Sequence, residues 1–287
     1  MRLAAVLAIV ACSSTPAEPT SLGAEPCNGW PELCDRTPLE ITTPMTHNSH
    51  ATLERGYHQT AANHLYAIPT QLEDGIRALN VDVYEDEGEM VACHGYCSLG
   101  SQPLSEVWAE ITDFLDDHPR EVVWLLLQDG APLDSTLASF DEAGMPERAY
   151  VHGESWLTLG EMIDDDTRLI LSGGGGGGDE APWYHRQDAL SFATNYGYPS
   201  PQQMDCQLRG DPLDGGLFEL VHTFLDPIAW EDLSEAGNPD LADRLEQCEA
   251  EVGLRANLLT VDWYHHGDVV GVAAEHNGLD PADRRTP

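Results

Sequence analysis

Short apolar runs alternate with amphipathic stretches along most of the chain. The runs are β-branched and aromatic, or nearly all apolar, which is typical of strands buried on both faces. The stretches between them place apolar residues at helical spacing, and Pro103 and Pro239 stand just before two of them, where proline favours a helix start. We therefore predict strands over Leu39–Met45, Ile76–Tyr84, Met90–Cys93, Glu121–Leu127, Arg168–Leu171, Ser191–Asn195, Phe218–Leu225 and Asn257–Trp263. We predict helices over Leu104–Asp117, Leu133–Ala143, Thr158–Asp164, Asp240–Ala250 and Val269–Asn277.

The order of these elements predicts the fold class. Strands that alternate with helices form parallel sheets, and some eight strands favour an α/β barrel in a single domain over an open, doubly wound sheet. No Gly-x-Gly-x-x-Gly motif follows the first strand, so a dinucleotide-binding fold has little support. Six glycines at Gly173–Gly178 follow one strand, and they are either a slack linker or a loop that covers or cradles a substrate.

The N-terminus predicts export. Arg2 precedes a short apolar run, Leu3–Ala11, which suits a signal peptide and is too short to cross a bilayer. The run ends at Cys12 and resembles a bacterial lipobox, which implies cleavage before Cys12 and lipidation of its thiol; an ordinary signal peptide cleaved elsewhere is the alternative. We expect a signal peptide over residues 1–11, a lipidated flexible tether over 12–26 and a barrel over 27–287. The mature chain would then be a lipoprotein of the bacterial cell envelope, on the outer membrane, or a secreted protein.

The cysteine count agrees with export. Of seven cysteines, lipidation of Cys12 leaves an even number, and disulfides persist outside the cytosol. Local spacing favours the bridges Cys27–Cys34 and Cys93–Cys97, and elimination leaves Cys206–Cys248. A zinc half-site at Cys93-His94-Gly95-Tyr96-Cys97 is the rival interpretation, although no second Cys/His pair stands at a matching spacing.

The charge excludes one class of partner. The formal net charge is −37, from 50 acidic residues and 13 basic residues that are all arginine. Such a field repels nucleic acid and anionic membrane surfaces. An anionic substrate therefore needs cations placed locally at its binding site.

Polar residues gather where the predicted strands end. The first strand ends at Thr46-His47-Asn48-Ser49, the third runs into His94, and the last carries Asp262. In a barrel these positions converge on the C-terminal rim. Two histidines suit acid–base attack on a phosphodiester, because one imidazole can take a hydroxyl proton while the other protonates the leaving oxygen.

These motifs carry a resemblance that spans about Leu39 to Asn277. Thr46-His47-Asn48-Ser49, Gly75-Ile76-Arg77 and Cys93-His94-Gly95 occur in the order found in the phosphatidylinositol-specific phospholipase C X-domain. The segments Cys206…Arg209-Gly210, Leu217–His222 and Val261-Asp262-Trp263-Tyr264…Gly267-Asp268 resemble the secreted microbial branch of that superfamily. The resemblance implies a distorted TIM (β/α)8 barrel in which His47 is the general base on the inositol 2-hydroxyl and His94 is the general acid for diacylglycerol. It also implies cyclic inositol phosphate as the first product, so the reaction is a lyase step that can continue to hydrolysis.

The resemblance further implies a calcium site. Metal-independent bacterial members place an arginine where this chain has Asp82, whereas calcium-dependent members place an aspartate there. An anion beside a phosphodiester is unfavourable unless a cation lies between them, so we expect Ca²⁺. Asn48 and Asp82 match ligand positions of that branch, while Asn80 and Gln128 stand where it has carboxylates, which weakens the site. Asp129 replaces Gln128 if the register is shifted by one residue, and Asp82 pairing with Arg77 is the structural alternative.

Three further residues are candidates for the site. Asp262 either orients an imidazole or caps the following helix. Arg209 is a candidate for binding substrate phosphate, although its Arg-Gly-Asp setting also suits a turn, and Tyr264 is a candidate for an aromatic wall against the substrate. His265 and His266 have no match in the family pattern.

We therefore expect a phosphodiesterase that cleaves phosphatidylinositol-type lipids, held at a membrane by its lipid anchor. A related barrel enzyme acting on glycerophosphodiesters or sphingolipids is one alternative, but those enzymes carry Glu-x-Asp where this chain has Asn80-Val81-Asp82. A non-catalytic surface module that binds a ligand or partner is the other alternative, and the amides at Asn80 and Gln128 favour it.

Overall fold

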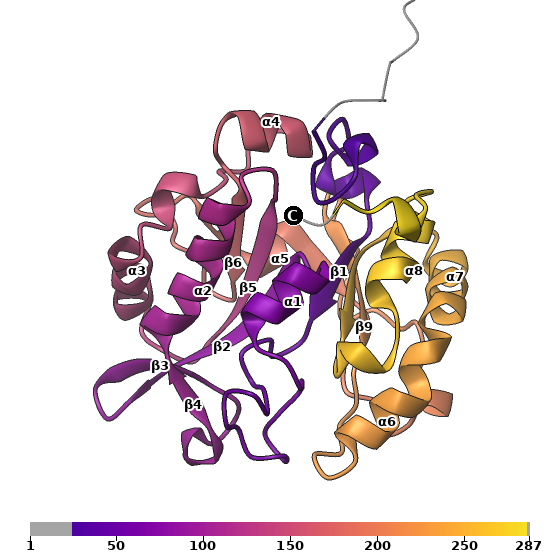
Figure 1. The fold of residues 1–287 in the computed structure, drawn as a ribbon, viewed down its shortest axis with the longest axis horizontal. Coiled ribbons are helices and arrows are strands. Elements are labelled where there is room, and N and C mark those ends of the chain that lie inside the picture. Colours follow the sequence, from indigo (N-terminus) through magenta and orange to yellow (C-terminus); the bar gives the residue numbers. More distant parts are fainter. Residues whose placement is uncertain (1–24, 286–287) are drawn as a thin grey trace, which may run out of the picture.

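Eight parallel strands curl into the wall of a half-open barrel in this computed structural model, which describes residues 25–285 (Figure 1). They follow the order β7-β6-β5-β2-β1-β10-β9-β8. Within the described chain no strand pairing joins β7 to β8, and the one-turn helix α5 (Gln187–Leu190) connects these two edges. The strands are β1 (Thr43–Thr46), β2 (Ala78–Asp86), β5 (Val123–Asp129), β6 (Leu169–Gly173), β7 (Tyr184–Arg186), β8 (Ser191–Ala193), β9 (Leu217–His222) and β10 (Ala256–Val261).

The longer helices cover the outside of this wall. In Figure 1, α2 and α3 flank one side of the strands and α6, α7 and α8 flank the other. α2 shows why the sequence forms a helix here, because its buried side chains recur at spacings of three and four residues. The helices are α1 (Ile68–Asp74), α2 (Leu104–Asp117), α3 (Leu133–Glu142), α4 (Leu159–Asp164), α6 (Trp230–Gly237), α7 (Leu241–Val252) and α8 (Val269–His276).

The distorted barrel and most of its predicted strands are confirmed, with one error of topology. The predicted strand Met90–Cys93 is β3 (Glu89–Cys93), but it runs antiparallel to β2 and pairs with β4 (Ser101–Pro103), outside the barrel wall. The eighth wall strand is β7, which the pattern missed because it is only three residues long. Helices α1, α5 and α6 were also missed. Two are shorter than eight residues, and α6 buries only Ser234 and Gly237, so it shows no apolar stripe.

The two faces of the sheet have different neighbours. On the outer face, Leu79, Val81 and Leu125 share one buried cluster with Trp108 and Ile111 of α2. On the inner face, alternate residues such as Ala78, Trp124 and Leu126 belong to a second cluster that fills the N-terminal half of the barrel. Polar residues replace apolar ones on this inner face toward the C-terminal ends of the strands, and this change creates the site described below.

Three disulfides join the cysteine pairs that the spacing predicted: Cys27–Cys34, Cys93–Cys97 and Cys206–Cys248. The bridge Cys93–Cys97 occupies both thiols of the rival zinc half-site. Cys12 lies outside the described residues. No helix in residues 25–285 combines the length and the apolar character needed to cross a membrane.

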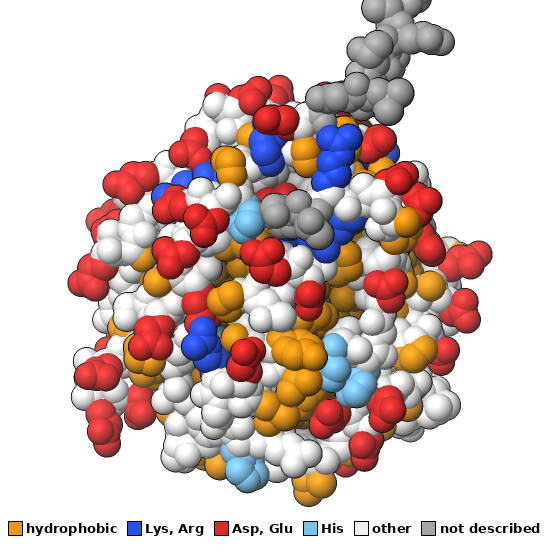
Figure 2. All heavy atoms as spheres, viewed as in Figure 1, with side chains coloured by type: hydrophobic (Ala, Val, Ile, Leu, Met, Phe, Trp, Pro, Cys, Tyr) orange, Lys and Arg blue, Asp and Glu red, His pale blue; other side chains and the backbone are white. Residues whose placement is uncertain are grey.

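The surface carries the excess of acid. Figure 2 shows Asp and Glu side chains spread over the face in view, with few basic side chains among them. A substrate anion therefore finds no broad basic surface on this face to attract it, in line with the formal charge of −37.

A buried ion pair closes the N-terminal end of the barrel beside β2. Arg77 Nε donates to Glu121 Oε2 at 2.6 Å, and Arg77 Nη1 donates to the carbonyls of Leu72 at 2.5 Å and Ile76 at 2.7 Å. The exposed fractions of the two charged side chains are 3% and 2%. Arg77 precedes β2, whereas Asp82 lies five residues further along it, so the suggested pairing of Asp82 with Arg77 is wrong.

Replacing Arg77 tests this ion pair. Arg77→Met leaves the Glu121 carboxylate buried without its cation, and we expect a loss of about 3–5 kcal/mol in the free energy of unfolding, measured by urea denaturation. Arg186→Met, which breaks the exposed pair with Asp188, is the matched control and should lose much less stability, because water screens that pair. Equal losses of unfolding free energy in the two variants would show that the buried pair contributes no more to stability than the exposed pair.

Candidate active site

The turn that carries His47 is fixed to the neighbouring strand β2. Asn48 has a left-handed backbone (φ 49°), which asparagine tolerates better than most residues. Its N–H donates to Asn80 Oδ1 at 3.1 Å, and the N–H of Ser49 donates to the Asn80 carbonyl at 2.7 Å. The N–H of Asn80 in turn donates to Ser49 Oγ at 3.0 Å. These bonds hold His47 at the C-terminal end of β1, on the rim of the barrel.

Asp262 orients the His47 ring. His47 Nδ1 lies 2.9 Å from Asp262 Oδ1, and because an ionised carboxylate only accepts, Nδ1 carries the proton and Nε2 is left free. The same oxygen accepts from Asn63 Nδ2 at 2.8 Å, and Oδ2 accepts from the N–H of Phe224 at 3.4 Å. The following helix α8 is capped instead by Asp268, whose Oδ1 accepts from the N–H of Gly271. Of the two interpretations of Asp262, the structure therefore supports the orienting role.

His94 lies beside His47 and has the same exposed nitrogen. Its Nδ1 is 3.1 Å from the carbonyl of Ala61, so this nitrogen donates and Nε2 is again free. Its ring stacks on Trp230 with centroids 5.2 Å apart, and it meets His47 edge-on at 6.4 Å. Two imidazoles of fixed tautomer thus stand next to each other on the rim.

Burial and charge separate the pKa values of the two histidines. Burial lowers the pKa of His47, but the charge and hydrogen bond of Asp262, with the charges of Asp82 and Glu219, together outweigh it, so its pKa is raised above the ordinary value. Burial lowers the pKa of His94, and the nearby His47 lowers it further. A single proton shared by the pair in the free protein therefore sits on His47.

A cavity of about 400 Å³ opens beside His47. Its floor is the polar inner face of the barrel and includes Glu219 and Thr260, and Thr260 Oγ1 donates to Glu219 Oε1 at 2.6 Å. Burial raises the pKa of Glu219. Arg209 lies on the wall, with its guanidinium 4.4 Å from the ring centroid of Tyr196. His94 is not among the lining residues, and its ring centroid lies 6.4 Å from that of His47.

The expected calcium ligands differ in how free their oxygens are. Asp82 Oδ1 and Asn48 Oδ1 are buried, and neither has a hydrogen-bond partner among the described residues. Burial raises the pKa of Asp82 to about 6, although the nearby His47 acts against this rise. Asn80 Oδ1 already accepts from Asn48, and Gln128 is exposed at the end of β5. Two buried oxygens without partners fit a hard cation, with one carboxylate charge to hold it.

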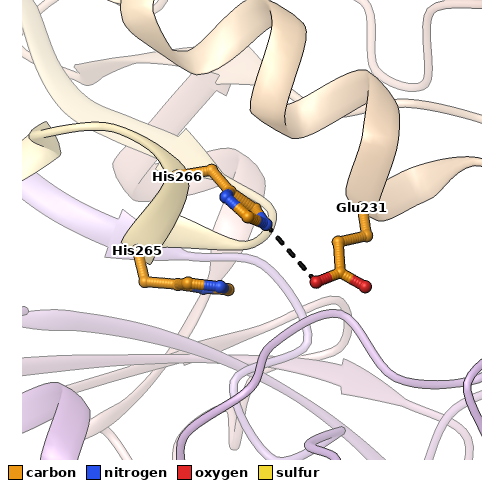
Figure 3. A group of neighbouring side chains, drawn as sticks. All are labelled: Glu231, His265 and His266. Atoms are coloured by element: carbon orange, nitrogen blue, oxygen red, sulfur yellow. Dashed lines mark hydrogen bonds and ion pairs between the residues drawn. The ribbon is translucent and has the colours of Figure 1, made fainter.

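Other candidate residues lie away from this cavity. Tyr264 is buried, and its hydroxyl donates to Asp74 Oδ2 at 2.7 Å, so it packs under the rim and does not form a wall against a substrate. Asp129 accepts from the hydroxyl of Tyr184 and from the N–H of Gly175. The latter bond and the pairing of Gly177 with Ala181 tie down the glycine run, which is therefore not a slack linker. His265 and His266 face Glu231, and none of these three residues lines the cavity (Figure 3).

Comparison with known proteins decides the family. The family model described as PI-PLC X 1 matches residues 33–277. The chain belongs to this family. It is 26% identical to PI-PLC X domain-containing protein 1 of Arthroderma benhamiae, over 88% of this chain and 90% of that one. A secreted protein of the same fungus is 27% identical, over 93% of this chain and 67% of its own length, and an Arabidopsis thaliana PI-PLC X domain protein is 26% identical, over 81% and 60%.

Solved structures show the same fold. Phosphatidylinositol-specific phospholipase C of Staphylococcus aureus superposes with a TM-score of 0.59 at 14% identity, over 87% of this chain and 96% of that chain. The Listeria monocytogenes enzyme gives 0.58 at 16% identity, over 85% and 95%. These likenesses establish the distorted TIM barrel of the PI-PLC X chain.

Three residues that shape this PI-PLC X site stand outside the sequence predictions. Glu219 interrupts an otherwise apolar strand, and a carboxylate inside such a run is a signal that could have revealed it. Asn63 lies in a loop with no pattern of its own, and Trp230 begins a helix that was not predicted. No sequence signal linked either of them to a histidine.

Removing the charge of Asp262 tests its hold on His47. In Asp262→Asn the imidazolium of His47 loses its anion while its burial remains, so we expect the pKa of His47 to fall. Histidine ring protons followed by NMR across a pH titration measure it, with the exposed Asp134→Asn as the control. A pKa of His47 that stays constant or rises would contradict the assigned hydrogen bond.

Proposed function

We propose that this PI-PLC X chain is a phosphodiesterase in which His47 is the general base and His94 is the general acid. The observation that carries the proposal is the pair of free Nε2 atoms on adjacent rings, each left free by a bond at Nδ1, to Asp262 at 2.9 Å and to the Ala61 carbonyl at 3.1 Å. Two imidazoles that are each held at Nδ1 can accept or release a proton at Nε2, which suits transfer of one proton in and one proton out.

The proposed reaction balances with these two groups alone. A hydroxyl oxygen of the head group attacks phosphorus while its proton moves to His47 Nε2. The bond from phosphorus to the lipid oxygen breaks, and that oxygen takes a proton from His94 Nε2. The two histidines must carry one proton between them. In the free protein this proton sits on His47, and a bound phosphodiester anion beside His94 shifts it to His94. The first product is then a cyclic phosphate, with a free lipid alcohol.

The cavity supports an inositol-type head group as the substrate class. Its lining offers hydrogen-bonding side chains on several sides of a space of about 400 Å³, including Glu219, Thr260 and Arg209. A ring with many hydroxyls satisfies such a surface, whereas an acyl chain would leave its polar groups unpaired. Arg209 supplies a cation at the wall of a chain whose overall charge opposes an anionic ligand.

We include calcium in the proposal. Asn48 and Asp82 would hold the ion through their free buried oxygens, with Asn80 and Gln128 as outer or weaker partners. When bound, Ca²⁺ would stabilise negative charge that develops on the phosphate. One carboxylate in this set supports a low affinity for the ion.

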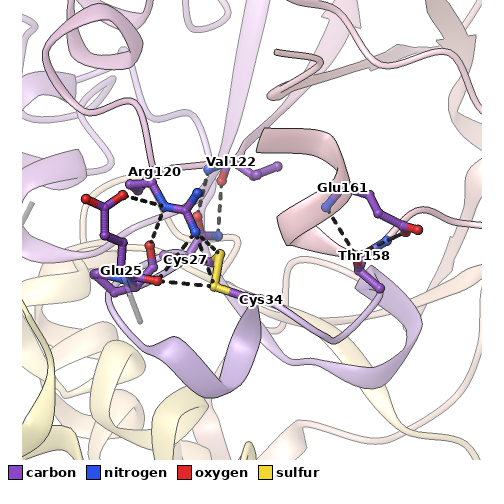
Figure 4. Close-up of a disulfide and its surroundings, with 9 residues drawn as sticks. Glu25, Cys27, Cys34, Arg120, Val122, Thr158 and Glu161 are labelled. Atoms are coloured by element: carbon purple, nitrogen blue, oxygen red, sulfur yellow. Dashed lines mark hydrogen bonds and ion pairs between the residues drawn. A yellow bond between two sulfur atoms is a disulfide. The ribbon is translucent and has the colours of Figure 1, made fainter. Parts of the chain in front are cut away.

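We also propose that the chain works outside the cytosol. Three disulfides support this location, and the bridge Cys27–Cys34 closes a short loop near the first described residue. Figure 4 shows Cys27–Cys34 beside Arg120, whose Nη2 lies 3.2 Å from Cys27 Sγ. The related Arthroderma protein is named as secreted. Lipidation at Cys12 and an outer-membrane position remain part of the proposal, and lipid at the membrane is then the partner of the anchored enzyme.

Variants of the two histidines test the acid–base roles. We expect His47→Ala and His94→Ala each to lower kcat on phosphatidylinositol by about 10²–10⁴-fold, because each removes one proton transfer. His58→Ala, at an exposed histidine outside the site, should keep full activity. Turnover in His47→Ala equal to that of the control would sink the mechanism.

Chelation tests the calcium proposal. Activity should fall when a calcium chelator is added and return with excess Ca²⁺, and Asp82→Asn should need more Ca²⁺ for half-maximal activity because it removes the one carboxylate of the set. Asp86→Asn, at the exposed end of the same strand, is the matched control. Activity that is indifferent to the chelator would refute the role of calcium and leave the histidine mechanism intact.

A further inference from the structure

Glu231, His265 and His266 form a second cluster of ligating side chains next to the proposed active site. One ligand atom from each lies within 4.8 Å of the others (Figure 3). Glu231 belongs to the first turn of α6, and the two histidines lie in the 3-10 turn Tyr264–His266 after β10. In Figure 3 both rings extend toward the Glu231 carboxylate. The cluster thus joins two segments that are far apart in the sequence.

The contact between His266 and Glu231 is long for a hydrogen bond, and its length is close to the separation of two ligands on one metal ion. His266 Nε2 lies 3.4 Å from Glu231 Oε1, whereas the pairs His276–Glu249 and His118–Glu73 lie at 2.9 and 3.0 Å. Two ligands on a tetrahedral Zn²⁺ ion, each about 2.0–2.1 Å from the metal, lie roughly 3.3 Å apart. The rings of His265 and His266 are packed with centroids 4.1 Å apart, so both face the same space.

A second observation also points to a ligand. His265 Nδ1 is buried and has no hydrogen-bond partner among the described residues. A buried polar atom in this state costs free energy that a bound cation would recover. Glu231 and His266 keep 38% and 20% of their side-chain surface exposed, so an ion can reach the cluster from solvent.

We propose that Glu231, His265 and His266 bind a divalent transition-metal ion of the Zn²⁺ class. Two imidazoles and one carboxylate select such an ion over Ca²⁺, which prefers oxygen ligands in larger number. Three protein ligands leave one position for water. This site shares no residue with the proposed calcium site at Asn48 and Asp82, and its ligands are of a different chemical kind.

The ion would act on the active site through Trp230. This residue directly precedes Glu231 and stacks on the ring of His94 at 5.2 Å. An ion that fastens the first turn of α6 to the turn after β10 holds Trp230 over His94. Glu231, His265 and His266 are thus positioning residues. This effect on catalysis rests on the proposed function, whereas ion binding itself does not.

Calorimetric titration of the chelator-stripped protein with Zn²⁺ tests the site. We expect one ion to bind per chain, and His266→Ala, His265→Ala and Glu231→Gln to weaken binding by at least about 100-fold, more than the loss of an outer-shell partner does. His118→Ala, which removes a His–Glu pair lacking a third ligand, should bind as tightly as the unmodified chain. His47→Ala should also bind normally, which separates this site from the proposed active site.

The melting temperature gives a second measurement that does not depend on activity. Zn²⁺ should raise the Tm of the unmodified chain and of His118→Ala but not that of His266→Ala, because a ligand of the native state stabilises it. Circular dichroism without metal checks that each variant is folded, and Glu231→Gln serves if a histidine variant is not. Absence of stoichiometric binding, or equal binding by His118→Ala and all ligand variants, would overturn the proposal. Full turnover in His47→Ala with stoichiometric Zn²⁺ binding would overturn the proposed function alone. Loss of turnover in His47→Ala, with no Zn²⁺ binding by the unmodified chain, would overturn the metal site alone.

Discussion

The hydrogen bond between His47 and the buried carboxylate of Asp262 governs the arrangement of the site. Asp262 has no solvent-exposed surface, and an isolated carboxylate in that position would be strongly destabilised. It is tolerated because His47, Asn63 and Phe224 all donate to it. Burial raises the pKa of Asp262, but the charge and hydrogen bond of His47, with the charge of His64 and the hydrogen bond of Asn63, outweigh it, so its pKa is lowered. Since β1 and β10 are adjacent parallel strands, one bond ties both strand ends and sets which nitrogen of His47 faces outward.

The second constraint is charge. A chain with a net charge of −37 gives an anionic substrate little help from long-range attraction, so cations must be placed at the site itself. The described residues offer the two histidines and Arg209, and Asp82 and Asn48 each have a buried side-chain oxygen without a hydrogen-bond partner. Burial raises the pKa of Asp82 to about 6, which shows that its carboxylate is poorly solvated.

Much of this arrangement follows from local sequence patterns, whereas the contacts between distant segments do not. Buried strands and amphipathic helices leave periodic patterns, so the barrel could be predicted, and Thr46-His47-Asn48-Ser49 marks the end of β1 within one short motif. The position of Met90–Cys93 outside the wall could not be read, because an apolar strand looks the same whether its neighbour is parallel or antiparallel. Asn63 and Trp230 act through contacts across loops, which leave no periodic trace. Tyr264 does not form the expected aromatic wall against the substrate, because the turn after β10 directs its hydroxyl to Asp74.

The central claim is that His47 acts as the general base and His94 as the general acid on one phosphodiester. It is tested most directly by comparing a lipid substrate with a head-group phosphodiester of nitrophenol, a leaving group that needs no proton. If His94 is the general acid, His94→Ala should regain most of its lost rate on the nitrophenyl substrate, while His47→Ala should stay impaired on both. Equal impairment of His94→Ala on the two substrates, or rescue of His47→Ala instead, would contradict the account.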